Sequence, residues 1–172
     1  MDTNQATPAP AAPALGHYAI DPAASTVAFT TRHVFGLLPV RGTFALRSGS
    51  VDVAEPLGAS RVRAEIDAAS FTTGSRQRDR AVRSARFLDA GRHPLITFTA
   101  DRVEATTVAG VLTVCGSARP VTLSIGESAC GAGWFTARAT VRVDRTAFGV
   151  TASRGMAGRH LDVTVGVRCV RA

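Results

Sequence analysis

The side chains that could act as nucleophiles, bases or metal ligands are few and scattered along this sequence. The three cysteines, Cys115, Cys130 and Cys169, form no C-x-x-C pair, and an odd number is atypical of a disulfide framework. The histidines are far apart as well: His17, His33, His93 and His160. Neither H-E-x-x-H nor G-x-S-x-G occurs, and the thirteen acidic residues fall mostly in turns or on polar faces. The sequence therefore predicts neither a catalytic centre nor a metal site, and no cofactor.

Positive charge is the other chemical property that the sequence offers. All twenty basic residues are arginines, the net charge is +7 and the pI is about 11.1. The densest run, from Arg76 to Arg92, could bind a diphosphate, or it could be a solvated surface. Within it Arg78 is a candidate contact for such a group, and a local pair with Asp79 is the alternative. A nucleic-acid-binding barrel is disfavoured because the aromatic residues alternate onto the faces opposite the arginines, whereas base stacking needs both on one face.

Short runs of alternating apolar and polar residues must position these side chains. Alternation is clear at 27–33, 61–67, 135–143 and 161–169, and weaker at 40–47, 50–54, 95–104, 107–115 and 120–126. This pattern is typical of antiparallel sheet with one buried face. One segment, Ser75 to Ala85, is typical of a helix, with Ser75 as its N-cap. The sequence thus predicts an all-β protein with one short helix, as a barrel or a two-sheet sandwich.

Length and composition predict one folded domain behind a tail. The chain has 172 residues, of which 45% are hydrophobic, which suits one core and not two. Residues 1–15 are rich in Pro and Ala, so we expect a disordered tail there and the domain over 16–172. The chain shows no basic region followed by an apolar segment, so we expect no secretory signal and a cytoplasmic location. We also expect no membrane span, because no run of apolar residues is long enough.

Four motifs in order resemble the YceI-like, polyisoprenoid-binding family. The first is residues 16–44, with Tyr18, the run Ser-x-Val-x-Phe ending at Phe29, and His33. The others are T-G, R-D, F-x-D and P-x-I-x-F over 71–98, G-x-L-T over 110–125, and R-x-x-F-G over 144–150. The resemblance covers about residues 17–171. Ala24 and Ala81 stand where the family commonly has histidine, so any polar contact of those histidines with a ligand is expected to be altered here.

The resemblance implies a lipocalin-like antiparallel barrel of about eight strands around an apolar tunnel. It implies an isoprenoid lipid as ligand, such as a polyprenyl chain or an isoprenoid quinone, which is carried or sequestered without catalysis. Members of the family can pair, so a homodimer stays open. The alternative functions are a small barrel enzyme that acts on an apolar substrate and the basic nucleic-acid-binding barrel considered above.

The residue types on the inward faces agree with a hollow barrel. Ala64, Gly110, Ala137 and Ala139 are small, and an eight-stranded barrel either fills with side chains or holds one small ligand. Each buried isoprene unit contributes roughly 3–4 kcal/mol, so several units suffice for tight binding. We expect the following tunnel residues, the last two as head-group contacts: Phe29, Phe44, Ile66, Phe71, Phe87, Phe98, Leu112, Phe148, His33 and Arg78.

Each of these residues also has an ordinary structural interpretation. Phe29, Phe44, Phe98 and Phe148 could be core residues, and packing and tunnel lining are compatible. Phe71 and Phe87 flank the helical segment and could seal one end of the barrel. His33 could be a buried histidine with its hydrogen bonds satisfied.

Overall fold

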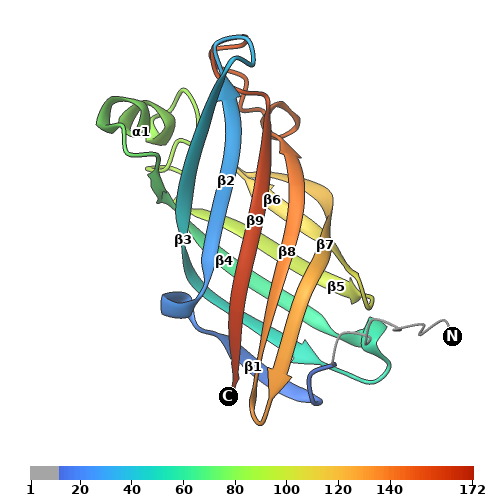
Figure 1. Cartoon of the computed structure of the whole chain (residues 1–172). Coiled ribbons are helices and arrows are strands. Elements are labelled where there is room, and N and C mark those ends of the chain that lie inside the picture. The colour runs from blue at the N-terminus through green and yellow to red at the C-terminus, as the bar shows by residue number, and fades with distance from the viewer. Residues whose placement is uncertain (1–11) are drawn as a thin grey trace, which may run out of the picture.

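Antiparallel strands close into a barrel with one helix at its rim (Figure 1). The structure, a computed structural model, describes residues 12–172. The strands are β1 (Gly16–Ile20), β2 (Thr26–His33), β3 (Leu38–Val53), β4 (Arg61–Thr72), β5 (Leu95–Val103), β6 (Thr107–Val114), β7 (Ser117–Gly131), β8 (Trp134–Asp144) and β9 (His160–Arg171). The helix α1 spans Arg76–Arg83, and three short 3₁₀ segments are η1 (Pro22–Ala24), η2 (Leu57–Ala59) and η3 (Arg145–Phe148).

The barrel has eight strand positions. Strands β2 to β9 pair in the order β3-β2-β9-β8-β7-β6-β5-β4, and the β3–β4 pairing closes the circle. Strand β1 pairs with β3 on one side and β9 on the other, beyond the start of β2, so that β1 and β2 share one position. The prediction of an antiparallel barrel of about eight strands with one short helix is confirmed, and the sandwich alternative is wrong.

Two strands differ from the sequence prediction. The runs 40–47 and 50–54 belong to one long strand, β3, whose register with β4 shifts between Thr43 and Ala45 and again between Leu46 and Ser48. Each bulge inserts an extra residue, so the side chains that follow it point to the opposite face of the sheet. The alternation in the sequence is interrupted there, and one strand looks like two separate runs. Strand β1 is five residues long and did not show as an alternating run.

The helix follows its predicted signals. The side chain of Ser75 accepts a hydrogen bond from the backbone N–H of Arg78 at 3.3 Å, as expected of an N-cap. In the described part of the chain no helix is long and apolar enough to cross a membrane.

The predicted tail, 1–15, lies mostly outside the described residues, which begin at 12. Its last residues lie against the end of the barrel where β1 begins. There the hydroxyl of Tyr18 donates to the carbonyl oxygen of Ala14 at 2.8 Å.

Buried apolar side chains form two clusters inside the barrel. One contains Tyr18, Ile20, Leu46, Val53, Phe135 and Cys169. The other, nearer α1, contains Phe29, Phe71 and Leu88, with Phe44 packed against it. Two clusters in place of one continuous core leave space along the inside of the barrel.

Candidate functional site

A cavity of about 440 Å³ runs along the inside of the barrel. At one end it is lined by Leu57 in the β3–β4 connection and by Glu104 in the β5–β6 connection. At the other end it reaches Arg78 on α1, Phe87 after it and Arg145 in η3. Its volume lies within the range of about 300–1,000 Å³ that is typical of ligand pockets. We call this cavity the tunnel, and its two limits the α1 end and the Glu104 end.

Inward residues from every strand line the tunnel, as the alternation predicted. On β8 these are Phe135, Ala137, Ala139, Val141 and Val143. Ala64 on β4 lines it too. Small side chains thus face the tunnel at three of the four positions expected to keep it open.

Gly110 does not contribute to this space, contrary to the prediction. A Cβ atom there would lie 2.8 Å from the Cβ of Ala100 on the neighbouring strand β5. The β5–β6 register shifts beside this point, between Ala100 and Arg102. Gly110 therefore allows two strands to approach closely at a bulge.

All ten predicted site residues lie on the lining of the tunnel. They are Phe29, His33, Phe44, Ile66, Phe71, Arg78, Phe87, Phe98, Leu112 and Phe148. Near the α1 end the rings of Phe29, Phe44 and Phe71 pack together, with centroids 5.2–5.6 Å apart. The phenylalanines thus both pack as core and face the tunnel. Their contact with a ligand stays a prediction.

His33 supplies one polar group to the α1 end. Its Nδ1 donates to the carbonyl oxygen of Met156 at 3.0 Å, which in the neutral ring leaves Nε2 as an acceptor. Burial lowers the pKa of His33, and the positive charges of Arg78 and Arg145 lower it further, while the bond to Met156 opposes them. The ring is therefore neutral at pH 7. His33 is both hydrogen-bonded and part of the lining, so its two interpretations are compatible.

Arg78 supplies the second polar group, and its predicted pair with Asp79 is wrong. Arg78 Nη1 donates to the hydroxyl of Thr73 at 3.0 Å. The buried carboxylate of Asp79 instead accepts from the Thr73 backbone N–H at 2.9 Å, from the Thr73 hydroxyl at 2.6 Å and from the Thr72 hydroxyl at 3.3 Å. Burial alone would raise the pKa of Asp79, but these hydrogen bonds and the nearby Arg83 hold it below its usual value. Asp79 thus orients Thr73, which in turn positions Arg78.

The other arginines of the run from Arg76 to Arg92 do not converge on the tunnel. Arg83 donates through Nε and Nη2 to the carbonyl oxygen of Phe71. Arg86 donates to the hydroxyl of Ser153 at 3.3 Å. Among the arginines of this run only Arg78 lines the tunnel, so the run as a whole does not form a diphosphate cradle.

Arg145 also lines the α1 end, and we did not predict it as a site residue. Its guanidinium donates to three carbonyl oxygens, of Gly158 at 2.7 Å, Val150 at 2.8 Å and Ala157 at 3.2 Å. It also lies over the ring of Phe87, 5.6 Å from the centroid. The R-x-x-F-G motif contains this residue, but a motif does not show which carbonyls an arginine reaches. Arg145 fixes the segment after η3 against the tunnel.

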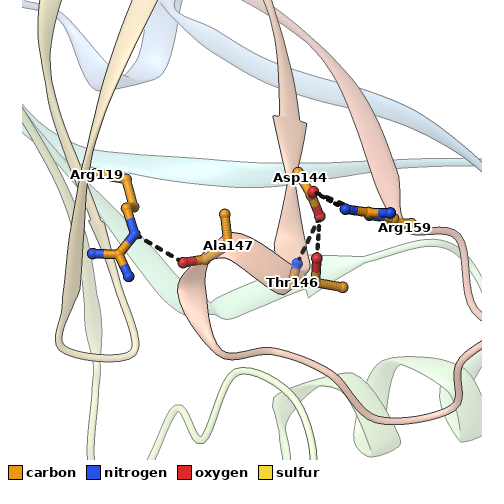
Figure 2. Close-up of polar contacts among 5 residues, drawn as sticks. All are labelled: Arg119, Asp144, Thr146, Ala147 and Arg159. Carbon is orange, nitrogen blue, oxygen red and sulfur yellow. Dashed lines mark hydrogen bonds and ion pairs between the residues drawn. The ribbon is translucent and has the colours of Figure 1, made fainter.

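Polar contacts fix the turn that carries Arg145 and Phe148 (Figure 2). Asp144 accepts from the backbone N–H and the hydroxyl of Thr146 at 2.9 and 2.6 Å, and pairs with Arg159 at 2.9 Å. The bonds from Arg159 and Thr146 hold the pKa of Asp144 far below its usual range, against the effect of burial. Arg119 on β7 donates to the carbonyl oxygen of Ala147 at 3.1 Å. The turn therefore presents Phe148, 3% exposed, to the tunnel in one orientation.

Two of the three thiols are held in the protonated form. Burial raises the pKa of Cys169, which is fully buried, to about 12. Burial and the charge of Asp89 raise the pKa of Cys115. A reactive cysteine needs a lowered pKa. Over residues 12–172, no group of three or more His, Cys, Asp or Glu side chains could hold a metal ion.

The two departures from the family pattern lie away from the tunnel. Ala24 in η1 and Ala81 in α1 are both exposed, and neither is part of the lining. Neither position contributes to the tunnel lining in this chain.

Eight antiparallel strand positions closed around an apolar tunnel define a small barrel of the cavity-enclosing class. Within that class the chain belongs to the YceI-like domain family, whose model matches residues 18–169. It is 31% identical over 142 residues to a UPF0312 protein of Azotobacter vinelandii, covering 76% of this chain and 73% of that protein. It is also 31% identical over 179 residues to a UPF0312 protein of Shewanella baltica, covering 95% and 92%.

Solved structures share the fold. BcnA of Burkholderia cenocepacia aligns with a TM-score of 0.74 and 22% identity, covering 87% of this chain and 98% of that one. A polyisoprenoid binding domain from Saccharophagus degradans, implicated in plant cell wall breakdown, aligns with a TM-score of 0.72 and 15% identity, covering 92% and 100%. The family model and the relatives of 31% identity confirm the family that the four motifs indicated.

Proposed function

We propose that this protein binds a long-chain isoprenoid lipid in its tunnel, and carries or sequesters it without catalysis. The observation that carries the proposal is the distribution of side chains along the tunnel. Most of the lining is apolar, while His33, Arg78 and Arg145 gather at the α1 end and Glu104 lies at the other end. A chain with an apolar tail and one polar head matches that distribution. The polyisoprenoid binding domain among the proteins of similar fold supports the same ligand class.

The length of the tunnel favours a ligand of several isoprene units. Strand β4 has 12 residues, which at about 3.3 Å per residue and a tilt of about 40° gives a barrel roughly 30 Å tall. Three buried units would contribute about 10 kcal/mol from their apolar surface. Association itself costs roughly 4–15 kcal/mol, so a short prenyl group would bind weakly and a longer chain tightly.

The polar residues of the α1 end suit a small uncharged head group. Nε2 of His33 can accept a hydrogen bond from the hydroxyl of a polyprenol. The guanidinium of Arg78 can donate to a quinone carbonyl, since its bond to Thr73 uses only one of its five N–H groups. Arg145 is already engaged with three backbone carbonyls, so we assign it to positioning. A cytoplasmic location and pairing of two copies stay predictions.

Native mass spectrometry of freshly purified full-length protein tests the proposal. We expect a mass excess that disappears on denaturation, and an isoprenoid alcohol or quinone in the solvent extract. Protein stripped of lipid should regain the excess mass on incubation with a long-chain polyprenol or an isoprenoid quinone. Recovery of fatty acids or phospholipids alone, together with no uptake of either isoprenoid, would refute the proposal.

A further inference from the structure

Large apolar side chains are exposed beside the α1 end of the tunnel. Phe35, Leu37 and Leu38 in and after the β2–β3 turn are 78%, 74% and 56% exposed, and Met156 in the segment before β9 is 52% exposed. We call residues 34–38 and 151–157 the mouth loops. Solvent contact with several large apolar groups in one place is unfavourable, and such patches mark surfaces that meet a partner or a membrane.

The two mouth loops form one surface, although they are far apart in the sequence. The backbone N–H of Val34 donates to the Met156 carbonyl at 2.8 Å, and that of Phe35 donates to the Gly155 carbonyl at 2.6 Å. They lie together above the end of the barrel near α1 (Figure 1). Val34 and Phe35 adopt φ angles of 51° and 53°, in the left-handed region that a β-branched residue strongly disfavours. The two backbone hydrogen bonds between the loops thus hold Val34 and Phe35 in a backbone conformation that their residue types disfavour.

Arginines surround this surface. Ten of the twenty arginines lie in the segments 32–38, 73–94 and 145–159, which hold only two carboxylates, Asp79 and Asp89. At the Glu104 end, the connections 54–60, 104–106 and 132–133 hold Glu55 and Glu104 and no arginine. The end that bears the exposed apolar residues therefore carries more positive charge than the opposite end, where Arg61 and Arg102 flank the connections that hold Glu55 and Glu104.

We propose that the mouth loops dock the protein on membranes that contain anionic lipids. Exposed phenylalanine, leucine and methionine side chains insert at the level of the lipid headgroups, and the surrounding arginines contact lipid phosphates. The tunnel lining continues directly into these loops through His33 and Ala157, so docking places the α1 end on the bilayer. A second copy of the chain fits this surface poorly, because a symmetric contact would bring two arginine-rich ends together.

The docking proposal goes beyond the proposed function and has an independent test. Full-length protein stripped of lipid is floated with vesicles of phosphatidylcholine alone or of phosphatidylcholine and phosphatidylglycerol, none of which contains an isoprenoid. We expect flotation with the phosphatidylglycerol vesicles, weaker flotation with phosphatidylcholine, and loss of binding as salt screens the charges. Membrane binding by a protein that yields no isoprenoid on purification and takes up neither a polyprenol nor an isoprenoid quinone would refute only the function proposed above.

Matched variants locate the binding surface. Phe35→Ser combined with Leu37→Ser should weaken vesicle binding at least tenfold, whereas Leu15→Ser, which removes a residue 53% exposed at the opposite end, should leave it unchanged. Arg154→Ser should reduce the preference for phosphatidylglycerol, and Arg102→Ser, exposed at the end of β5, should not. The double variant Leu37→Trp, Trp134→Phe carries its single tryptophan in the mouth loops. Its fluorescence emission should shift to shorter wavelength when the vesicles are added. This shift reports insertion directly and does not depend on a loss of binding.

Three results would overturn the proposal. One is no flotation of the wild type with phosphatidylglycerol vesicles. Another is an equal effect of the mouth-loop variants and their controls. The third is a dimer in solution that the Phe35 and Leu37 substitutions dissociate, which would assign the surface to a second copy of the chain.

Discussion

Replacement of Ala139 by phenylalanine tests directly whether the tunnel is where the ligand binds. Ala139 lies on β8, opposite Ile125 on β7 and Val165 on β9, and its side chain lines the tunnel. The next residue, Thr140, is exposed on the outer face, so Thr140→Phe is a matched control on the same strand. The new ring brings about six carbons into the tunnel, slightly more than one isoprene unit.

The expected losses can be worked from that comparison. Displacing one isoprene unit removes roughly 3–4 kcal/mol of binding free energy, which weakens affinity by a factor of about 10²–10³. Isoprene units that would lie in the tunnel beyond the new ring are excluded as well, because the ring blocks the tunnel. Because the ring enters open space, we expect little change in the free energy of unfolding. A ring forced into a close-packed interior would instead destabilise the fold by about 1–3 kcal/mol. In a domain of this size that loss lowers the Tm by roughly 2–12 °C.

Two measurements on the same samples separate these cases. Native mass spectrometry after incubation with a long-chain polyprenol gives occupancy, and thermal unfolding gives Tm. We expect Ala139→Phe to lose lipid occupancy with a nearly unchanged Tm, and Thr140→Phe to keep the occupancy and the Tm of the wild type. Retention of the lipid by Ala139→Phe at the wild-type level would show that the ligand lies elsewhere. A large fall in Tm would show that the interior is already filled.

Three further predictions concern the groups that hold the α1 end. Because the folded-state pKa of His33 is lowered from 6.5, its neutral ring stabilises the fold above about pH 6.5, and this contribution is lost as the pH falls. His33→Asn should therefore reduce the fall in Tm between pH 7 and 5. Asp79→Asn replaces an acceptor of three hydrogen bonds and should lower the free energy of unfolding by about 1–3 kcal/mol in denaturant titrations. The Asp79 contribution is present above pH 3.8, the ordinary pKa, and is lost below it. Arg145→Met leaves three carbonyls without their donor and should speed tryptic cleavage after Arg154 by about tenfold, whereas Arg142→Met, exposed on β8, should leave the rate unchanged.

Alternation in the sequence predicted the lining of the tunnel well because strand geometry leaves little choice. Side chains along a strand point to opposite faces in turn, and a one-residue slip would move the whole apolar set of β8 into water. The inward positions from Phe135 to Val143 therefore follow from residue types alone. Residue size at Ala137 and Ala139 likewise indicated a hollow interior.

Features that depend on contacts between distant segments could not be predicted in this way. The bulges in β3 break the two-residue period, and Gly110 makes room for a neighbouring strand, so its small size indicated a wider tunnel incorrectly. Asp79 is adjacent to Arg78 in sequence, but the fold turns its carboxylate toward Thr73. The partners of Arg145 are carbonyls of a segment whose position depends on the whole barrel.

A barrel with an open middle must draw its stability from the strand ladder and from its two ends. The two apolar clusters meet this need, one around Tyr18 and Phe135, whose rings are 4.9 Å apart, and one around Phe29 and Phe71. Between Phe135 and the α1 end, β8 presents alanine and valine, which bury little area against one another. An occupant of the tunnel would supply the apolar contacts that the middle lacks, and by mass action a ligand bound only by the folded state raises the free energy of unfolding. The small residues that open the tunnel thus leave the middle of the barrel with few apolar contacts of its own.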